Sequence, residues 1–237
     1  MPRPTITAFD WVPSFARGQV RDLRVRWMLE EIGEPYHVRY LSQGEQKADD
    51  HRSRQPYGQV PTLEDEGLTI FESGAIVLHL AETRKAMLPE DAAGRARALE
   101  WLFAALNTVE PVLSDLATID IFEYDQPWSA PRRPAVEQRL RERLSGTAAR
   151  LGDREWFDHA FSIGDLMMVT VLRIIGKDPL LAEHPALTAY VARGEARPAF
   201  QRALAAQIAG FTGNAPPRFA DWLTGWEEAQ ALRQTNP

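Results

Sequence analysis

The chain has 237 residues, a formal net charge of −6 at pH 7 and no cysteine. This length allows one large domain or two small ones. The acidic balance gives no reason to expect nucleic acid or an anionic membrane as a partner. Without cysteine, the protein can form no disulfide and has no thiolate of its own. The start of the chain lacks an apolar signal segment, and no apolar run approaches membrane-spanning length. We therefore expect a cytoplasmic protein that does not enter the membrane.

The first quarter of the chain predicts strands around one helix. Residues 6–12 alternate in polarity and are rich in β-forming side chains, which predicts a strand. Residues 21–33 place apolar side chains at helical spacing and end in Gly33, a favourable helix C-cap. Residues 35–41 predict a second strand, and the polar residues 42–54 predict a solvated loop or short helix.

Residues 55–82 carry the most specific pattern in the chain. Thr62–Glu64 and Leu68–Phe71 predict two strands joined by a turn at 65–67, which makes an antiparallel hairpin. Ser73 then opens a helix whose apolar side chains follow at helical spacing. The order strand, helix, strand, hairpin and helix is compatible with several α/β folds.

Two positions in this segment predict a peptide-binding site. If the peptide bond between Val60 and Pro61 is cis, Val60 presents its N–H and C=O groups to an extended peptide, which could bind as an added strand. Glu72 and Ser73 stand where a strand gives way to a helix. The free N–H groups of a helix start suit a carboxylate, and Ser73 adds a hydroxyl donor. Glu72 supplies a negative charge for an ammonium group, so the pattern fits a small zwitterionic peptide.

These residues also carry a resemblance. The sequence QPYGQVP at 55–61 followed by FESGAI at 71–76 resembles the glutathione site of the cytosolic glutathione transferases. The resemblance implies an α/β thioredoxin-like domain at 1–84, a linker at 85–94 and an all-α domain at 95–237, with the active cleft between the domains. It also implies glutathione as co-substrate, a small-molecule electrophile as acceptor, a homodimer and a role in detoxification.

The family stabilises the glutathione thiolate with a Ser, Tyr or Cys at the end of the first strand. Counting back without gaps places that position on Gln19, in a loop that is longer than usual. Ser14 is the only hydroxyl in this loop, and Arg17 and Arg21 are candidate cations. A hydrogen bond or a positive charge would lower the pKa of a bound thiol. Ser14, an arginine and a backbone N–H all remain open as the sulfur partner.

The resemblance also implies which residues bind the rest of glutathione. Lys47 lies where family members often place a basic side chain for the glycyl carboxylate, although a plain solvated lysine is the alternative. Gln59 could reach the same carboxylate. The five histidines show no metal-ligand spacing, so we expect no metal site. The implied glutathione-binding residues are Lys47, Gln59, Val60, Pro61, Glu72 and Ser73.

The rest of the chain predicts only helices. Residues 95–116 form one long helical pattern with a kink expected at Pro111, and residues 132–151 form another. The stretch between them, 120–134, is aromatic and contains prolines, which indicates an ordered loop.

A helix-capping pattern begins at Ser162. Ser162 can cap the next helix while Asp165 bonds back to it, and Phe161 can pack on Leu166 as a hydrophobic staple. The helix that follows is apolar nearly all round and is therefore expected in the core. This pattern resembles the family's capping box, whose role is in folding.

Three further helices are expected towards the end of the chain, at 187–193, 200–208 and 218–233. The last is amphipathic. It could pack on the helical domain, which is the interpretation we prefer, or cover the acceptor pocket as a lid.

The sequence therefore predicts a glutathione transferase in which the glutathione thiolate attacks an electrophilic small molecule. Two alternatives stay open. One is a glutathione-dependent isomerase or dehalogenase, in which attack is followed by release of glutathione. The other is a non-catalytic binding or interaction protein that has kept the fold.

Overall fold

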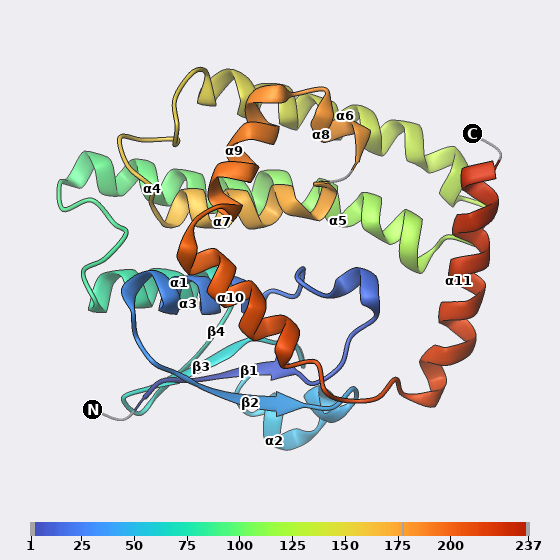
Figure 1. Ribbon diagram of the computed structural model, residues 1–237, viewed down its shortest axis with the longest axis horizontal. Coiled ribbons are helices and arrows are strands. Elements are labelled where there is room, and N and C mark those ends of the chain that lie inside the picture. The colour runs from blue at the N-terminus through green and yellow to red at the C-terminus, as the bar shows by residue number, and fades with distance from the viewer. Residues whose placement is uncertain (1–2, 177, 236–237) are drawn as a thin grey trace.

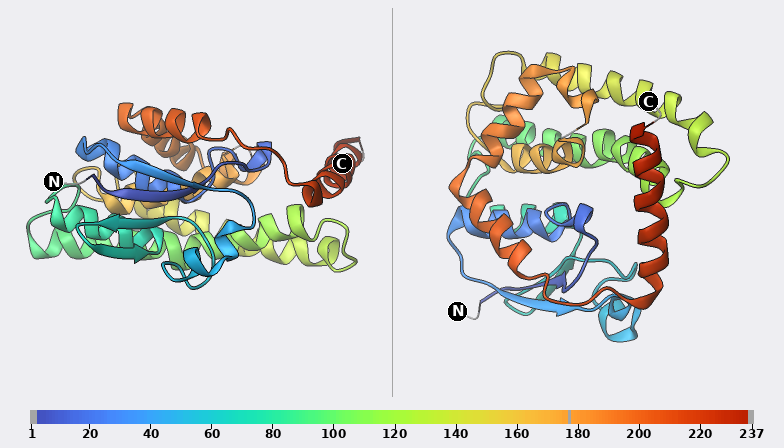
Figure 2. Two further views of the ribbon diagram at one scale, coloured as in Figure 1. Left: turned by 90° about the horizontal axis from the view of Figure 1, so that it is seen from below. Right: turned by 45° about the vertical axis from the view of Figure 1, so that its right-hand side comes forward.

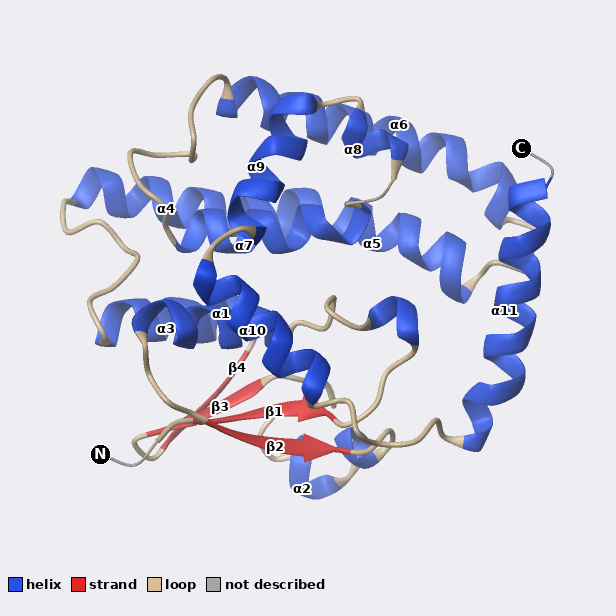
Figure 3. Cartoon of the chain, in the orientation of Figure 1, coloured by secondary structure: helices blue, strands red, loops and turns tan. Residues whose placement is uncertain are grey.

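The computed structural model describes residues 3–176 and 178–235, which form a sheet domain and a helical domain (Figure 1). The sheet has the strand order β2-β1-β3-β4. Strand β1 (Thr5–Phe9) runs parallel to β2 (His37–Leu41) and antiparallel to β3 (Thr62–Asp65), which forms a hairpin with β4 (Leu68–Phe71). This is the thioredoxin-like arrangement that the resemblance implied. Figure 3 shows the four strands gathered at one end of the molecule.

Helices α1 (Asp22–Ile32) and α3 (Ser73–Thr83) lie between the sheet and the helical domain (Figure 1). The expected C-cap is confirmed: Gly33 adopts φ +70°, and its N–H bonds the carbonyl of Leu29. The first strand is shorter than predicted, because pairing with β2 ends at Phe9. The polar stretch after β2 contains only short helical turns. These are a 3₁₀ turn at Glu45–Lys47 and α2 at Asp49–Arg52.

The second half of the chain is helical, as expected. A short 3₁₀ turn follows α7 at Arg173–Ile175, and another lies in the first half of the chain, before α1, at Ser14–Ala16. The helices of this half are α4 (Ala92–Ala104), α5 (Glu110–Ala117), α6 (Ser129–Leu151), α7 (Ile163–Leu172), α8 (Pro179–Ala182), α9 (Pro185–Glu195), α10 (Pro198–Ala209) and α11 (Pro217–Thr235).

The expected kink near Pro111 appears as a π-helical turn, Ala105–Val109, that joins α4 to α5. A proline has no N–H to give to the preceding turn, so the regular bonding pattern is interrupted there. Helix α4 begins at Ala92, earlier than the predicted 95, because the Asp91 side chain accepts a hydrogen bond from the Gly94 N–H at 2.7 Å. The linker is correspondingly shorter than 85–94.

The predicted loop at 120–134 is largely wrong. A second π turn, Thr118–Phe122, extends the α5 run, and α6 already begins at Ser129. Of the three prolines in this stretch, Pro127 does lie in the short turn before α6. Pro131 lies in the first turn of α6, where a proline's missing N–H has no partner in any case. Pro134 lies inside the helix, which continues past it.

The helical run Ala92–Phe122 is long and apolar enough to cross a membrane, judged by length and composition alone. The sequence-based expectation that no apolar run approaches membrane-spanning length is therefore not met when the run is judged by length and composition. The finding is weak evidence for a membrane segment, because the core helix of a soluble protein passes the same test. In this structure 44% of the apolar window is buried inside the protein.

The capping pattern at α7 is confirmed. The Asp165 carboxylate accepts hydrogen bonds from the Ser162 N–H at 3.0 Å and the Phe157 N–H at 3.0 Å, and from the Tyr190 hydroxyl at 3.0 Å. The Ser162 hydroxyl accepts from the Gly164 N–H at 3.2 Å. Every residue of α7 is buried, which agrees with its apolar sequence. The capping box therefore fixes the start of the central helix.

Helix α11 contacts both domains, which the sequence did not decide. Figures 1 and 2 show it standing apart from the other helices and spanning the distance from the sheet domain to the far end of the helical domain. The Trp226 indole N–H donates to the Asp120 carbonyl at 3.0 Å, while its ring lies 4.6 Å from that of Phe15, between centroids. The preferred interpretation, packing on the helical domain, is therefore only part of what α11 does.

We predict that loss of the α7 cap lowers stability in proportion to the donors left without an acceptor. Ser162→Ala should cost about 1 kcal/mol of unfolding free energy. Asp165→Ala should cost roughly 2–3 kcal/mol, because two buried donors outside the cap, Phe157 N–H and Tyr190 O–H, also lose their acceptor. Asp165→Asn, which keeps one acceptor oxygen, is the matched control and should fall between the parent and Asp165→Ala. Urea unfolding measures all three, and identical midpoints would rule out the cap as a source of stability.

Candidate functional site

The loop before β3 is built to expose one backbone segment. The Val60–Pro61 bond is cis, and β3 begins at the next residue. Two buried side chains, His51 and Gln55, contact the backbone of Gln59 in this loop. His51 Nε2 lies 2.6 Å from the Gln59 carbonyl oxygen, and the Gln55 side-chain oxygen accepts from the Gln59 N–H at 3.2 Å. The backbone beside Val60 is thus fixed on the side away from the site.

The start of α3 lies beside this loop and offers free N–H groups. Glu72, the residue before the helix, adopts φ +71°, a left-handed conformation that is uncommon for a residue with a side chain. No side-chain hydrogen bond caps the helix among the described residues. Ser73 is buried at 4% exposure. The geometry is that of an anion-binding helix start, with a backbone conformation of the strained kind that often marks functional sites.

A buried arginine connects this helix start to the helical domain. Arg24, on α1, donates from Nη1 to the Ser73 hydroxyl oxygen at 3.2 Å. Its Nη2 lies 2.9 Å from Oε1 of Glu110, on α5. Arg21, one turn earlier, pairs with the same oxygen at 2.9 Å. Arg24 and Glu110 are nearly buried, since the Arg24 side chain is 4% exposed and that of Glu110 8%.

The network gives the site its charge at neutral pH. Burial raises the pKa of Glu110, but Arg24 and Arg21 outweigh burial and hold that pKa below the ordinary value of 4.5. Burial lowers the pKa of Arg24, while Glu110 opposes this effect, and an arginine stays charged at neutral pH in any case. Because the Ser73 oxygen already accepts from Arg24, its own proton is available to a ligand carboxylate.

The network and the helix start line one cleft of about 310 Å³ between the two domains. The predicted residues Gln59, Glu72, Ser73 and Arg21 all line it. Lys47 lies on the outer side of the same loop, exposed, and its ammonium group donates to the Tyr57 carbonyl at 3.1 Å. Of the six predicted binding residues, Gln59, Glu72 and Ser73 therefore line this cleft, whereas Lys47, Val60 and Pro61 are not among its lining residues.

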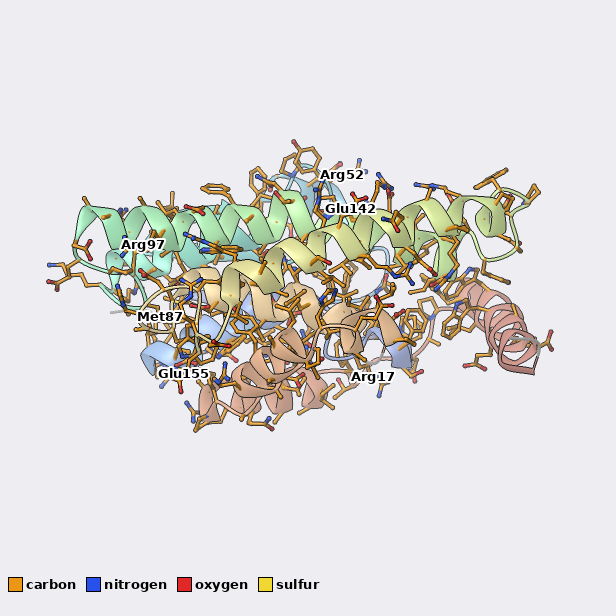
Figure 4. All side chains as sticks on the ribbon, turned by 90° about the horizontal axis from the view of Figure 1, so that it is seen from above. Arg17, Arg52, Met87, Arg97, Glu142 and Glu155 are labelled. Carbon is orange, nitrogen blue, oxygen red and sulfur yellow. The ribbon has the colours of Figure 1, made fainter. Side chains whose placement is uncertain are left out.

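Ser14 and Arg17 lie elsewhere. Both are exposed and line a separate, larger cleft of about 700 Å³ against the ends of α7 and α9. Gln19, where the ungapped register falls, lines the same cleft and donates to the Arg173 carbonyl at 3.3 Å. Figure 4 shows Arg17 at the outer surface. The three catalytic candidates of the loop are thus divided, and only Arg21 shares a cleft with Ser73.

Sequence reasoning missed Arg24, Glu110 and His51. A signal existed for Arg24, because it interrupts the apolar spacing of α1 on a side that is buried. For Glu110 the only local signal was its position next to Pro111, which does not indicate a site residue. Nothing in the sequence connects Glu110 with Arg24, 86 positions earlier. His51 was counted only in the search for metal-ligand spacing.

Comparison with known proteins identifies the family. Residues 7–82 match the family model described as glutathione S-transferase, N-terminal domain. A probable glutathione S-transferase of Oryza sativa subsp. japonica, GSTF2, is 30% identical over 186 residues, which cover 74% of this chain and 86% of that protein. The chain belongs to the glutathione S-transferase family. The fold class that the sequence predicted is therefore confirmed.

Other members of the family are also similar. A glutathione transferase structure from Burkholderia graminis, with two glutathione molecules bound per subunit, has a TM-score of 0.74 and 26% identity, and the match covers 85% of this chain and 87% of that one. A probable maleylacetoacetate isomerase 2 of Drosophila melanogaster is 32% identical over 129 residues, which cover 50% of this chain and 56% of that protein.

Proposed function

We propose that this protein is a glutathione transferase that binds glutathione in the cleft between Val60, Glu72 and Ser73. The observation that carries the proposal is the pairing of an uncapped helix start with a buried Arg24–Ser73 contact. The γ-glutamyl carboxylate would accept from Ser73 and the α3 N–H groups, and Glu72 would pair with the ammonium group. The cysteinyl backbone would bond Val60, held by Pro61, and Lys47 or Gln59 would face the glycyl carboxylate.

In this proposal the reaction is attack by the bound thiolate on an electrophilic small molecule. Arg21 is the member of the predicted catalytic set that lies in the glutathione cleft. We therefore assign thiolate stabilisation to Arg21 together with the N–H groups at the start of α1. Arg21 is shared with Glu110, which reduces its field at the sulfur. Ser14 and Arg17 remain weaker candidates, because they line a different cleft.

The isomerase alternative also has support. In an isomerase or dehalogenase the same thiolate attacks, and glutathione leaves again in a later step. The similarity to the Drosophila protein named an isomerase favours keeping this alternative. A non-catalytic binding protein is the third hypothesis. Turnover of an activated aryl halide with consumption of glutathione would favour the transferase. A cytoplasmic role in detoxification belongs to the same proposal and rests on the family resemblance.

We also propose a homodimer. An apolar groove lined by Gly74, Leu78 and Leu106 lies between α3 and the α4 run, and Phe103 beside it is 52% exposed. A second copy of the chain could cover this groove in a symmetric pair. Light scattering at micromolar concentration should give the mass of two chains, and Phe103→Glu should shift it towards one. Ile208→Glu, at a 42%-exposed site on α10, is the control and should stay dimeric. A parent protein of single-chain mass would refute the dimer.

Glutathione affinity tests the binding part of the proposal. Ser73→Ala should weaken binding by about 1–3 kcal/mol, because a buried charge-assisted hydrogen bond to the ligand carboxylate is lost. Ser53→Ala removes an exposed hydroxyl on the far side of the loop and should bind as the parent does. Isothermal calorimetry measures both, and unchanged affinity in Ser73→Ala would count against the site.

The pKa of the bound thiol tests the catalytic part. Arg21→Ala should raise that pKa, and each pKa unit corresponds to about 1.4 kcal/mol of lost thiolate stabilisation. Added salt should weaken the difference, since the Arg21 side chain is 47% exposed. Ser14→Ala and Arg17→Ala should titrate as the parent does. The measurement is a pH titration of thiolate absorbance in the glutathione complex. If only Ser14→Ala changed the pKa of the bound thiol, the sulfur would have to lie near Ser14 rather than near Arg21.

A further inference from the structure

Helix α10 of the helical domain packs against α1 of the sheet domain and places one polar side chain at the start of α1. This side chain is Gln207, which is buried at 1% exposure. Its amide nitrogen donates to the Val20 carbonyl at 3.1 Å and to Oδ1 of Asp22 at 2.7 Å. The two acceptors lie on either side of Arg21 in the chain. One amide of the helical domain therefore holds both neighbours of the cation that we assign to the thiolate.

The amide of Gln207 can lie in only one orientation. Both groups that it meets are oxygen atoms, so the NH₂ group must face them and the amide oxygen must point away. That oxygen, Oε1, is buried and has no hydrogen-bond partner among the residues that the structure describes. A buried acceptor without a partner costs free energy. An apolar side chain of similar size would avoid this cost, so stable packing alone does not account for Gln207.

Asp22, the first residue of α1, is held on both of its carboxylate oxygens. It is 1% exposed, and its Oδ2 accepts from Arg26 Nε at 2.7 Å, one turn further along the helix. Burial raises the pKa of Asp22, while Arg26 and Gln207 oppose this effect. Arg26 is itself buried, and its guanidinium lies 5.9 Å from the centre of the Tyr36 ring. Because neither oxygen can move without losing a buried partner, the first turn of α1 is fixed in place.

Two ion pairs hold the other end of α1 against the same region. Arg202 of α10 donates to Oε2 of Glu30 at 2.7 Å, and Arg197, just before α10, donates to Oε1 of Glu31 at 2.6 Å. Both pairs are partly exposed to solvent, so each adds little to stability. They match the start of α10 to the end of α1, which leaves Gln207 to hold the start of α1.

The position of Arg21 depends on these contacts. Its Nη2 lies 2.9 Å from Oε1 of Glu110, and its side chain is 47% exposed. A long, half-exposed side chain follows its own backbone. A cation that moves from about 4 Å to about 5 Å from a sulfur changes the thiol pKa by about 0.6 unit at an effective dielectric constant of about 20. A small displacement of the backbone beside Arg21 is therefore measurable at a bound thiol.

We infer that Gln207 is a positioning residue: it holds the start of α1 so that the Arg21 guanidinium lies beside the glutathione sulfur. The inference rests on the proposed transferase function. Gln207 is not among the described residues that line the cleft of Arg21 and Ser73, so it acts on the sulfur only through α1. In this way the helical domain helps to set the acidity of a thiol that is bound mainly by the sheet domain.

The pKa of the bound thiol tests this positioning. Gln207→Met keeps the size of the side chain but removes both donors, and it should raise that pKa by about 0.5 unit or more. The affinity for S-methylglutathione, which has no thiol, should stay that of the parent. Gln207→Asn keeps the donors on a shorter side chain and should give a smaller rise. An unchanged thiol pKa in both variants would refute the inference.

The direction of the change separates position from charge. Without Gln207, Asp22 loses support for its ionised form. If Asp22 then gained a proton, a negative charge near the site would disappear and the thiol pKa would fall. A rise thus supports positioning, and a fall would refute it.

A double-variant cycle tests the route through Arg21. In the Arg21→Ala background, Gln207→Met should add less than about half of the shift that it causes in the parent, because the cation that it positions is gone. An equal shift in both backgrounds would contradict action through Arg21.

Hydrogen exchange tests the same contact without glutathione. The N–H groups of Leu23 and Arg24 are hydrogen-bonded within the first turn of α1. In Gln207→Met their exchange should become about fivefold faster, since the start of α1 loses its two bonds to α10. Gln201→Met changes the same residue type at an exposed site on α10 and is the control, with the exchange rates of the parent.

Glutathione calorimetry on the parent decides the proposed function separately. If glutathione does not bind, the transferase proposal fails, while the exchange rates still decide whether Gln207 holds the start of α1. Unchanged exchange in Gln207→Met would refute the positioning role even if glutathione binds.

Discussion

The buried ion pair between Arg24 and Glu110 is the contact on which the rest of the site depends. A guanidinium and a carboxylate at 4% and 8% exposure lose most of their hydration, so each must keep its partner. The two residues come from different domains, and the same arginine also holds the Ser73 hydroxyl. The separation of α1, α3 and α5 is therefore fixed at the point where the proposed ligand binds.

The core supports this placement from behind. Trp27, about one turn after Arg24 on α1, packs between Phe161 and Phe200, with ring centroids 5.4 Å and 4.8 Å away. Phe161 precedes the capped start of α7, so the capping box also positions α1. Helices α4 and α7 can approach closely because Gly164 has no side chain. A Cβ at this position would lie only 2.8 Å from the Ala98 carbonyl oxygen. Stability in the helical domain is thus linked to the geometry of the cleft proposed to bind glutathione.

The loop before α1 divides the space between the domains. Its first half lies over the ends of α7 and α9, where Arg173 donates to the Gly18 carbonyl at 2.7 Å. Its last residue, Arg21, turns to Glu110 and the glutathione cleft. Phe15 carries the contact with α11. One loop therefore helps to bound two openings of different chemistry, an arginine-containing cleft and the cleft proposed to bind glutathione.

The sequence by itself determined the features that depend on neighbouring residues. The hairpin, the helix start at Ser73, the cap at Ser162 and the C-cap at Gly33 each need only a few consecutive side chains, and all appear as predicted. The cis bond before Pro61, which had been only a condition for the predicted strand-like recognition, is present. Local rules also failed locally, as at 120–134, where Pro131 fits the first turn of α6 and the helix continues past Pro134.

Only the tertiary structure decided which distant charges meet. The pairing of Arg24 with Glu110 joins residues 24 and 110, and no local propensity records such a contact, because it depends on how two domains dock. The same docking separated Ser14 from Arg21, although they are seven residues apart in one loop. It also placed Trp226 against Phe15 across the molecule. The sequence thus pointed to the proposed glutathione-binding segment from its own residues, while the proposed role of Arg21 follows from packing between elements that are remote in the chain.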